Sequence, residues 1–192
     1  MNNLPNQDKN NLQIINLNGH QISVNIRNYY DQDNLELIDI FRSYPTSSSL
    51  SYVVDRSPDY FALCKLQGID WRLIVAEKEK IFGSILINFD KVFLESKEQN
   101  ICYTCDLRLD TSVRRVWLAD CLMREGIYAC REKYGDSANI FTCVLKDNQA
   151  GLKKNANLER DNIIKMNKVG EIKTYFFIPF VSKNHFLKFF SG

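Results

Sequence analysis

The clearest candidate for a phosphate-binding site in this chain is the position of two adjacent arginines, Arg114 and Arg115. They lie between a predicted strand at 101–109 and the first turn of a long amphipathic helix predicted at 112–134. A strand that turns into a helix gathers unpaired backbone N–H groups and the positive end of the helix dipole at one corner. Arginines on the first turn oppose that dipole, which favours a bound anion such as phosphate. The alternative is a pair of solvated side chains.

Metal and thiol chemistry find little support in the residue types. Cys102 and Cys105 have C-x-x-C spacing, but on a strand their side chains face opposite ways, and no second cysteine pair or nearby histidine accompanies them. His20 and His185 lie near opposite ends of the chain, which argues against a cysteine–histidine nucleophile. All six cysteines fall within predicted strands or helices, as buried free thiols do. We predict no metal.

Composition is that of an average globular chain. The 192 residues are 45% hydrophobic and 25% charged, with a formal net charge of +2. Basic residues are interleaved with acidic ones and form no stripe, which argues against a nucleic-acid partner. No apolar run approaches the roughly 20 residues that span a bilayer, and the polar N-terminus lacks a secretory signal. We therefore expect a cytoplasmic protein without a membrane span.

The pattern around the arginine corner predicts a mixed sheet flanked by helices. Apolar runs between turn signals predict strands at 12–17, 21–27, 71–77, 81–94, 101–109, 140–145, 162–169 and 171–179. Helical spacing and capping residues predict helices at 33–44, 57–68, 112–134 and, after Asp147-Asn148, to about Asn155. We expect one domain at 12–180, between a flexible arm at 1–11 and an aromatic tail at 181–192.

This order of elements resembles the GNAT superfamily of acyl-CoA-dependent N-acyltransferases over roughly residues 22–179. The family's signature, [RQ]-x-x-G-x-[GA], falls on Arg114, Arg115, Val116, Trp117, Leu118 and Ala119. The family also begins its next short helix with an asparagine, where this chain has Asn148. The run SPDYFALCKLQG…WRLIVAE…IFGS, followed by DLRL, is similar to a bacterial GNAT-like subgroup.

The resemblance implies an α/β (α+β) fold with a mixed, mostly antiparallel central sheet of about seven strands and helices on both faces. It implies that Leu107, Arg108 and Leu109 supply a strand edge for the pantetheine arm of acetyl-CoA or another acyl-CoA. An N–H near Leu107 would polarise the thioester carbonyl. The diphosphate would lie on the N–H groups of residues 115–120, and Asn148 would bind the pantetheine arm or act only as a helix cap.

Two positions depart from the family pattern. Trp117 stands where the signature has glycine, a residue that lets the backbone approach the pyrophosphate. The tyrosine that often serves as general acid after the short helix is missing from the run 153–158. These departures weaken the expectation of coenzyme binding without changing the expected fold.

Amine acylation needs a base or a water chain that takes a proton from the nucleophile. Asp106 is the best-placed carboxylate, although strict alternation puts it on the same face as Arg108, where a structural ion pair is the competing interpretation. Tyr103 is the second catalytic candidate, through its hydroxyl, or else an ordinary core residue.

The sequence thus predicts an N-acyltransferase, most simply an N-acetyltransferase, acting on a small-molecule or peptide amine. Two alternatives stay open: a degenerate GNAT-like module that serves as an interaction domain, and an acyltransferase supplied by an acyl carrier protein. A homodimer is possible. The acceptor, the acyl chain length and the role of the aromatic tail cannot be read from the residues.

Overall fold

In the described part of the chain, six strands form one sheet in the order β1-β2-β3-β4-β5-β6. The computed structural model describes residues 11–17, 20–43, 54–113 and 117–173. The strands are β1 (Asn11–Leu17), β2 (His20–Asn28), β3 (Asp70–Glu77), β4 (Ile81–Leu94), β5 (Lys97–Leu109) and β6 (Asn139–Phe141). The first five are antiparallel neighbours, whereas β6 joins β5 in parallel.

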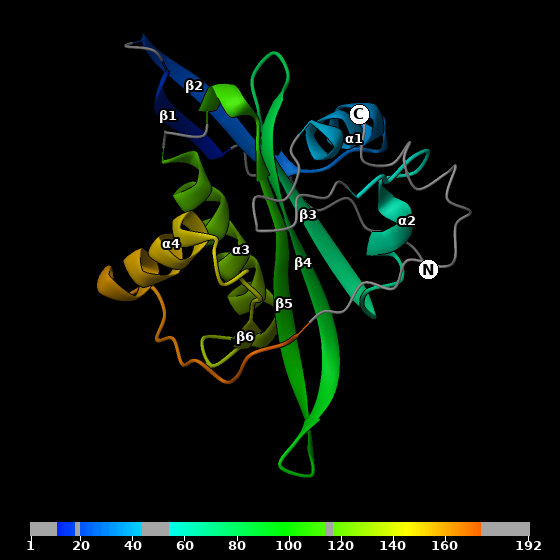
Figure 1. Cartoon of the computed structure of the whole chain (residues 1–192), viewed down its shortest axis with the longest axis vertical. Helices are drawn as coiled ribbons and strands as arrows, with labels where there is room; N and C mark the ends of the chain where they lie inside the picture. The colour runs from blue at the N-terminus through cyan, green and yellow to red at the C-terminus, as the bar shows by residue number, and fades with distance from the viewer. Residues whose placement is uncertain (1–10, 18–19, 44–53, 114–116, 174–192) are drawn as a thin grey trace, which may run out of the picture.

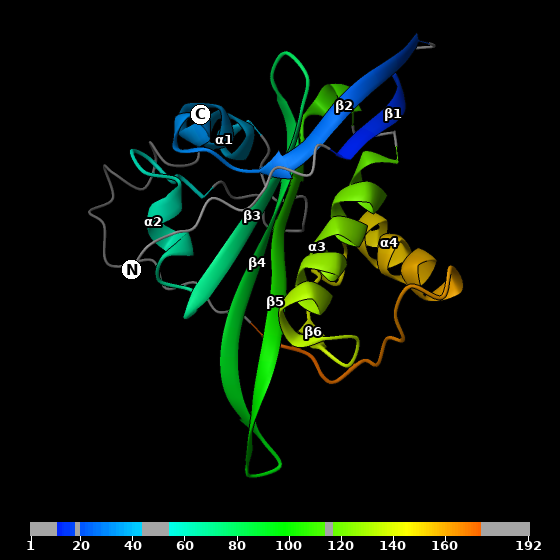
Figure 2. The same cartoon turned by 180° about the vertical axis from the view of Figure 1, so that it is seen from behind.

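The helices divide between the two faces of this sheet (Figures 1 and 2). They are α1 (Asn34–Arg42), α2 (Phe61–Cys64), α3 (Leu118–Tyr134) and α4 (Gln149–Arg160), with short 3-10 turns η1 (Asp31–Asp33) and η2 (Thr111–Val113). Helices α1 and α2 lie on one side of the sheet, and α3 and α4 lie on the other. The long antiparallel pair β4–β5 runs between the two helical layers.

Each helical layer encloses its own apolar core. On β4, residues 81–89 are all buried, as expected for a strand covered on both faces. Ile85 and Ile87 join the core under α3, whereas Leu86 joins the core under α1 and α2. Successive strand residues point to opposite faces, so one apolar run builds both cores. The mixed sheet with helices on both faces is confirmed, with six strands in place of about seven.

The predicted strand at 162–169 is wrong. The Ile163 N–H donates to the Leu158 carbonyl over 2.9 Å, and the Arg131 guanidinium donates to the Ile163 carbonyl over 2.6 Å. These bonds fasten the backbone after α4 to the helices, so it is not available to a strand ladder. Residues 171–173 also form no strand, and the rest of the segment predicted at 171–179 lies outside the described residues.

Two predicted helices are shorter in the structure. Helix α2 is a single turn, because the Phe61 N–H is taken by the Asp59 side chain over 2.9 Å and the Tyr60 N–H by the Asn34 side chain over 2.8 Å. Helix α3 begins at Leu118, since Asp110 accepts from the Ser112 N–H and closes the separate turn η2. Side-chain acceptors, one of them 26 residues away in the sequence, thus delay the start of the helix in both places.

The terminal segments are largely outside the described residues. The predicted tail at 181–192 lies there entirely, as does the predicted arm at 1–11 except for Asn11, the first residue of β1. In the part of the chain that the structure describes, no helix combines the length and the apolar character needed to cross a bilayer.

Candidate functional site

A β-bulge interrupts β5 just before its end. Cys105 pairs with Leu86 on β4, but the next pair in the ladder is Arg108 with Ser84, so Asp106 and Leu107 together face Ile85. Asp106 has φ +52°, in the left-handed region that non-glycine residues seldom adopt. The extra residue resets the alternation of side chains along the strand.

Because of this reset, the side chains at the end of β5 are divided between the two apolar cores. Leu107 and Leu109 pack against the core under α3. The Arg108 guanidinium instead lies 5.0 Å from the centre of the Phe41 ring on α1, and Cys105 packs against the core under α1 and α2. Asp106 therefore shares the α1–α2 side with both Cys105 and Arg108.

Among the residues that the structure describes, the edge of β5 that faces away from β4 is open beyond Thr104. Strand β6 pairs with β5 only through residues 101–103, and the Thr142 hydroxyl then donates to the Thr104 carbonyl over 3.0 Å. In the described ranges, no strand pairs with that edge from Cys105 to Leu109.

The hydrogen-bond ladder between β4 and β5 determines which backbone groups of β5 face this edge. The Asp110 N–H donates to the Phe82 carbonyl over 2.7 Å, so Asp110 faces β4. Since backbone direction alternates in an antiparallel pair, Arg108 also faces β4, whereas the N–H and C=O groups of Leu107 and Leu109 face the open edge. Gly83 permits this tight pairing, because a Cβ there would lie 2.8 Å from the Arg108 carbonyl oxygen.

The corner after β5 presents helix amides. Trp117 precedes α3, and its carbonyl accepts from the Asp120 and Cys121 N–H groups. The Trp117 side chain makes no capping hydrogen bond within the described residues. The first N–H groups of an α-helix, here those of Leu118 and Ala119, have no acceptor within the helix itself. Arg114, Arg115 and Val116 lie outside the described residues.

The indole of Trp117 is 40% exposed. It therefore points toward solvent at the start of α3 and does not fill the core beneath it. This exposed ring stands at the signature position where the family has glycine, a residue without a side chain.

One acidic side chain accompanies the helix amides. Asp120 on the first turn of α3 pairs with the Lys154 ammonium of α4 over 2.6 Å, and its other carboxylate oxygen is buried without a partner. A carboxylate here stabilises the helix dipole but repels a phosphate, and Lys154 offsets part of that repulsion.

Asp106 pairs with Arg56, which corrects the predicted pairing with Arg108. The Arg56 side chain is 5% exposed, and the Asp106 side chain is 20% exposed. Fifty residues separate the two partners, and the bulge that brings them together has no signature in the local pattern, so the sequence carried no signal for this contact.

Tyr103 and Asn148 have structural partners. The Tyr103 ring lies 5.6 Å from the Phe141 ring, and burial raises its pKa to about 12. Its hydroxyl therefore stays protonated and suits hydrogen-bond donation. Asn148 accepts from the Gly151 N–H over 3.0 Å as the N-cap of α4, which matches the plain capping alternative.

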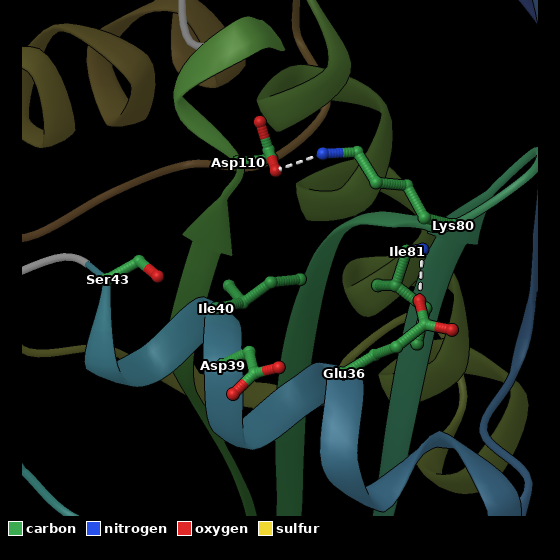
Figure 3. Close-up of a pocket in the computed structure, with 7 residues that line it drawn as sticks. All are labelled: Glu36, Asp39, Ile40, Ser43, Lys80, Ile81 and Asp110. Atoms are coloured by element: carbon green, nitrogen blue, oxygen red, sulfur yellow. Dashed lines mark hydrogen bonds and ion pairs between the residues drawn. The ribbon is translucent and has the colours of Figure 1, made fainter.

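A pocket of about 190 Å³ opens on the α1 side of the β5 terminus (Figure 3). Its lining comprises Glu36, Asp39, Ile40, Ser43, Lys80, Ile81 and Asp110. Glu36 accepts from the Ile81 N–H over 2.7 Å, and Lys80 pairs with Asp110 over 2.7 Å. Sequence reasoning missed this pocket because its residues come from three elements far apart in the chain. Three carboxylates and one ammonium favour a cationic group over an anion.

The described residues contain no group of three or more His, Cys, Asp or Glu side chains that could hold a metal ion. The site is therefore built mainly from backbone amides, one buried ion pair and a small acidic pocket.

No family model matches the sequence, and no curated protein matches it significantly. Solved structures do match. One is a glucosamine-6-phosphate N-acetyltransferase from Arabidopsis thaliana, with 20% identity over 80% of this chain and 98% of that one, at a TM-score of 0.55. Another is an aminoglycoside acetyltransferase from an uncultured soil metagenomic sample, with 20% identity over 81% and 97% of the chains, at a TM-score of 0.56.

A third match is a transcriptional regulator from Bacillus halodurans, with 16% identity over 80% and 99% of the chains and a TM-score of 0.58. At such identities the likeness shows the fold alone. The chain therefore has the GNAT fold, as the resemblance of its motifs implies. The bacterial subgroup stays a prediction.

Proposed function

We propose that this protein is an N-acyltransferase that moves an acyl group, most simply acetyl, from a coenzyme A thioester to an amine. The observation that carries the proposal is the open backbone edge at Leu107 and Leu109, which leads to the start of α3. Acetyltransferases among the structural neighbours share this fold.

The donor would be held mainly by backbone groups. The pantetheine arm would pair with Leu107 and Leu109 as an added strand does, and the diphosphate would accept from the N–H groups of Leu118 and Ala119. Arg114 and Arg115 stay the predicted side-chain ligands of the phosphates. The residues that the structure describes fit such a donor, except at Trp117, which replaces the signature glycine.

The chemical step is a direct attack in a ternary complex. The amine nitrogen would add to the thioester carbonyl carbon, the N–H of Leu107 would stabilise the developing oxyanion, and the C–S bond would then break. The amine proton leaves to water and the coenzyme thiolate is protonated. Water is favoured over Asp106 because that carboxylate is already engaged by Arg56.

Thermal-shift titration with acetyl-CoA tests the proposal. A ligand at about 100 times its dissociation constant adds about 2.7 kcal/mol to the free energy of unfolding. Parallel titrations with pantetheine and with adenosine 3′,5′-diphosphate separate the strand edge from the helix corner. We expect a shift with the intact thioester and a smaller one with each fragment.

The same titrations decide between the alternatives. An acyltransferase supplied by a carrier protein would respond to pantetheine and not to the nucleotide. An interaction module would respond to none of the three at millimolar concentration, and the exposed Trp117 is the observation that favours it.

We also propose a cytoplasmic location, which suits cysteines that are all free. The acceptor would be a small-molecule or peptide amine. A homodimer stays a prediction.

A further inference from the structure

The ion pair between Arg56 and Asp106 joins the α1–α2 side of the fold to the sheet at the bulge of β5. Asp106 is the residue whose φ of +52° creates the extra position in the strand. The left-handed conformation is unfavourable for aspartate compared with glycine, so a contact elsewhere must hold it. The ion pair with Arg56 is such a contact of the Asp106 side chain among the residues that the structure describes.

Arg56 is itself fixed on the α1–α2 side. Its guanidinium lies 4.7 Å from the centre of the Phe41 ring and 5.0 Å from that of Tyr60, which is fully buried. Its Nη1 lies 3.9 Å from the Cys64 sulfur. Because the Arg56 guanidinium is held among these groups, it cannot move with Asp106 if β5 shifts its register against β4. Arg56 therefore fixes the position of the Asp106 carboxylate.

The bulge determines which way Leu107 faces. Continuing the register of Cys105 with Leu86 would pair Leu107 with Ser84, and its N–H would then point into the β4 ladder. It would also turn the Arg108 side chain toward the apolar core under α3. With the bulge in place, the Leu107 N–H faces the open edge.

We propose that Arg56 and Asp106 are positioning residues that hold the Leu107 amide toward the acyl donor, and that Asp106 is not the general base. The role assigned to the amide rests on the proposed acyltransferase function. The positioning itself is a property of the fold and can be measured without any ligand.

Amide exchange of ¹⁵N-labelled protein gives the ligand-free test. The Leu107 N–H should exchange rapidly in the unsubstituted protein. Arg56→Met should slow that exchange at least tenfold, because the strand relaxes into a regular ladder. The double variant Arg56→Met with Asp106→Gly should restore rapid exchange, since glycine adopts a positive φ at little cost. Arg160→Met, which removes an exposed ion pair with Asp161 at the end of α4, is the matched control and should change nothing.

Calorimetric titration with acetyl-CoA gives the second readout. Arg56→Met should weaken binding at least tenfold, and the double variant should return to within threefold of the starting affinity. If Arg56→Met does not fold, the double variant alone decides. Unchanged exchange in Arg56→Met, or a folded double variant with slow exchange or lost affinity, overturns the proposal. An unsubstituted protein that ignores acetyl-CoA but follows the exchange pattern refutes the acyltransferase function and keeps the positioning.

Discussion

The Lys154 ammonium of α4 lies 2.6 Å from the Asp120 carboxylate on the first turn of α3. This pair joins the two helices beside the amides proposed to receive a diphosphate. It also places a negative charge where a phosphate would bind, and a cation that offsets it. Single substitutions of Asp120 or Lys154 should therefore make the charge at the donor site more favourable or less favourable to a phosphate.

Removing the negative charge of Asp120 should strengthen nucleotide binding. We expect Asp120→Asn to raise the affinity for adenosine 3′,5′-diphosphate by about two- to fivefold, because a helix-terminal charge contributes about 0.3–1 kcal/mol. Lys154→Met should lower it by a similar factor. Calorimetry at low and high salt measures both, and the differences should shrink as salt screens the charges. Equal affinities of all three proteins at low salt would place the phosphates elsewhere.

Removing the indole of Trp117 should open the corner. Trp117→Gly should increase acetyl-CoA affinity about tenfold if the ring crowds the diphosphate, a change of about 1.4 kcal/mol. Trp117→Ala separates the effect of the ring from the backbone freedom of glycine. Tyr128→Ala, on an exposed position of the same helix, is the control. Weaker binding in both Trp117 variants would show that the indole is a ligand contact.

The protein should lose stability in alkaline solution as buried acids ionise. Burial raises the pKa of Tyr103 to about 12 and that of Cys64 to about 11. The unfolded chain therefore releases these protons first, so the free energy of unfolding falls as pH rises above about 9 for the thiol and above about 10 for the phenol. Urea unfolding from pH 8 to 11 measures the decline. Tyr103→Phe should flatten it above pH 10, and an unaltered slope would argue against a buried phenol.

The core under α1 and α2 should depend strongly on Leu86. This side chain is fully buried on β4, so Leu86→Ala should lower the free energy of unfolding by about 2–5 kcal/mol. Leu66→Ala removes a side chain that is 82% exposed and should change it by less than about 0.5 kcal/mol. Chemical denaturation measures both, and similar values for the two variants would contradict the described packing.

Local patterns in the sequence were sufficient for most of the scaffold. The boundaries of β4 follow from a mostly apolar stretch between two polar turns, and the start of α4 follows from the capping residue Asn148. Both depend on residues close together in the chain, where periodicity and capping act directly. The arrangement of helices on both faces of one sheet follows from the order of these elements.

The tertiary structure alone decided the partners and directions of the site. The Arg56–Asp106 pair joins residues 50 positions apart, and the bulge beside it reverses the facing of Leu107 through one extra residue. The single-turn α2 and the missing strand at 162–169 arise from hydrogen bonds to distant groups, such as that from Arg131 to Ile163. Residue types and spacing determine which elements form, because those forces act within a few residues. Which backbone groups stay open depends on contacts that exist only once the layers have packed.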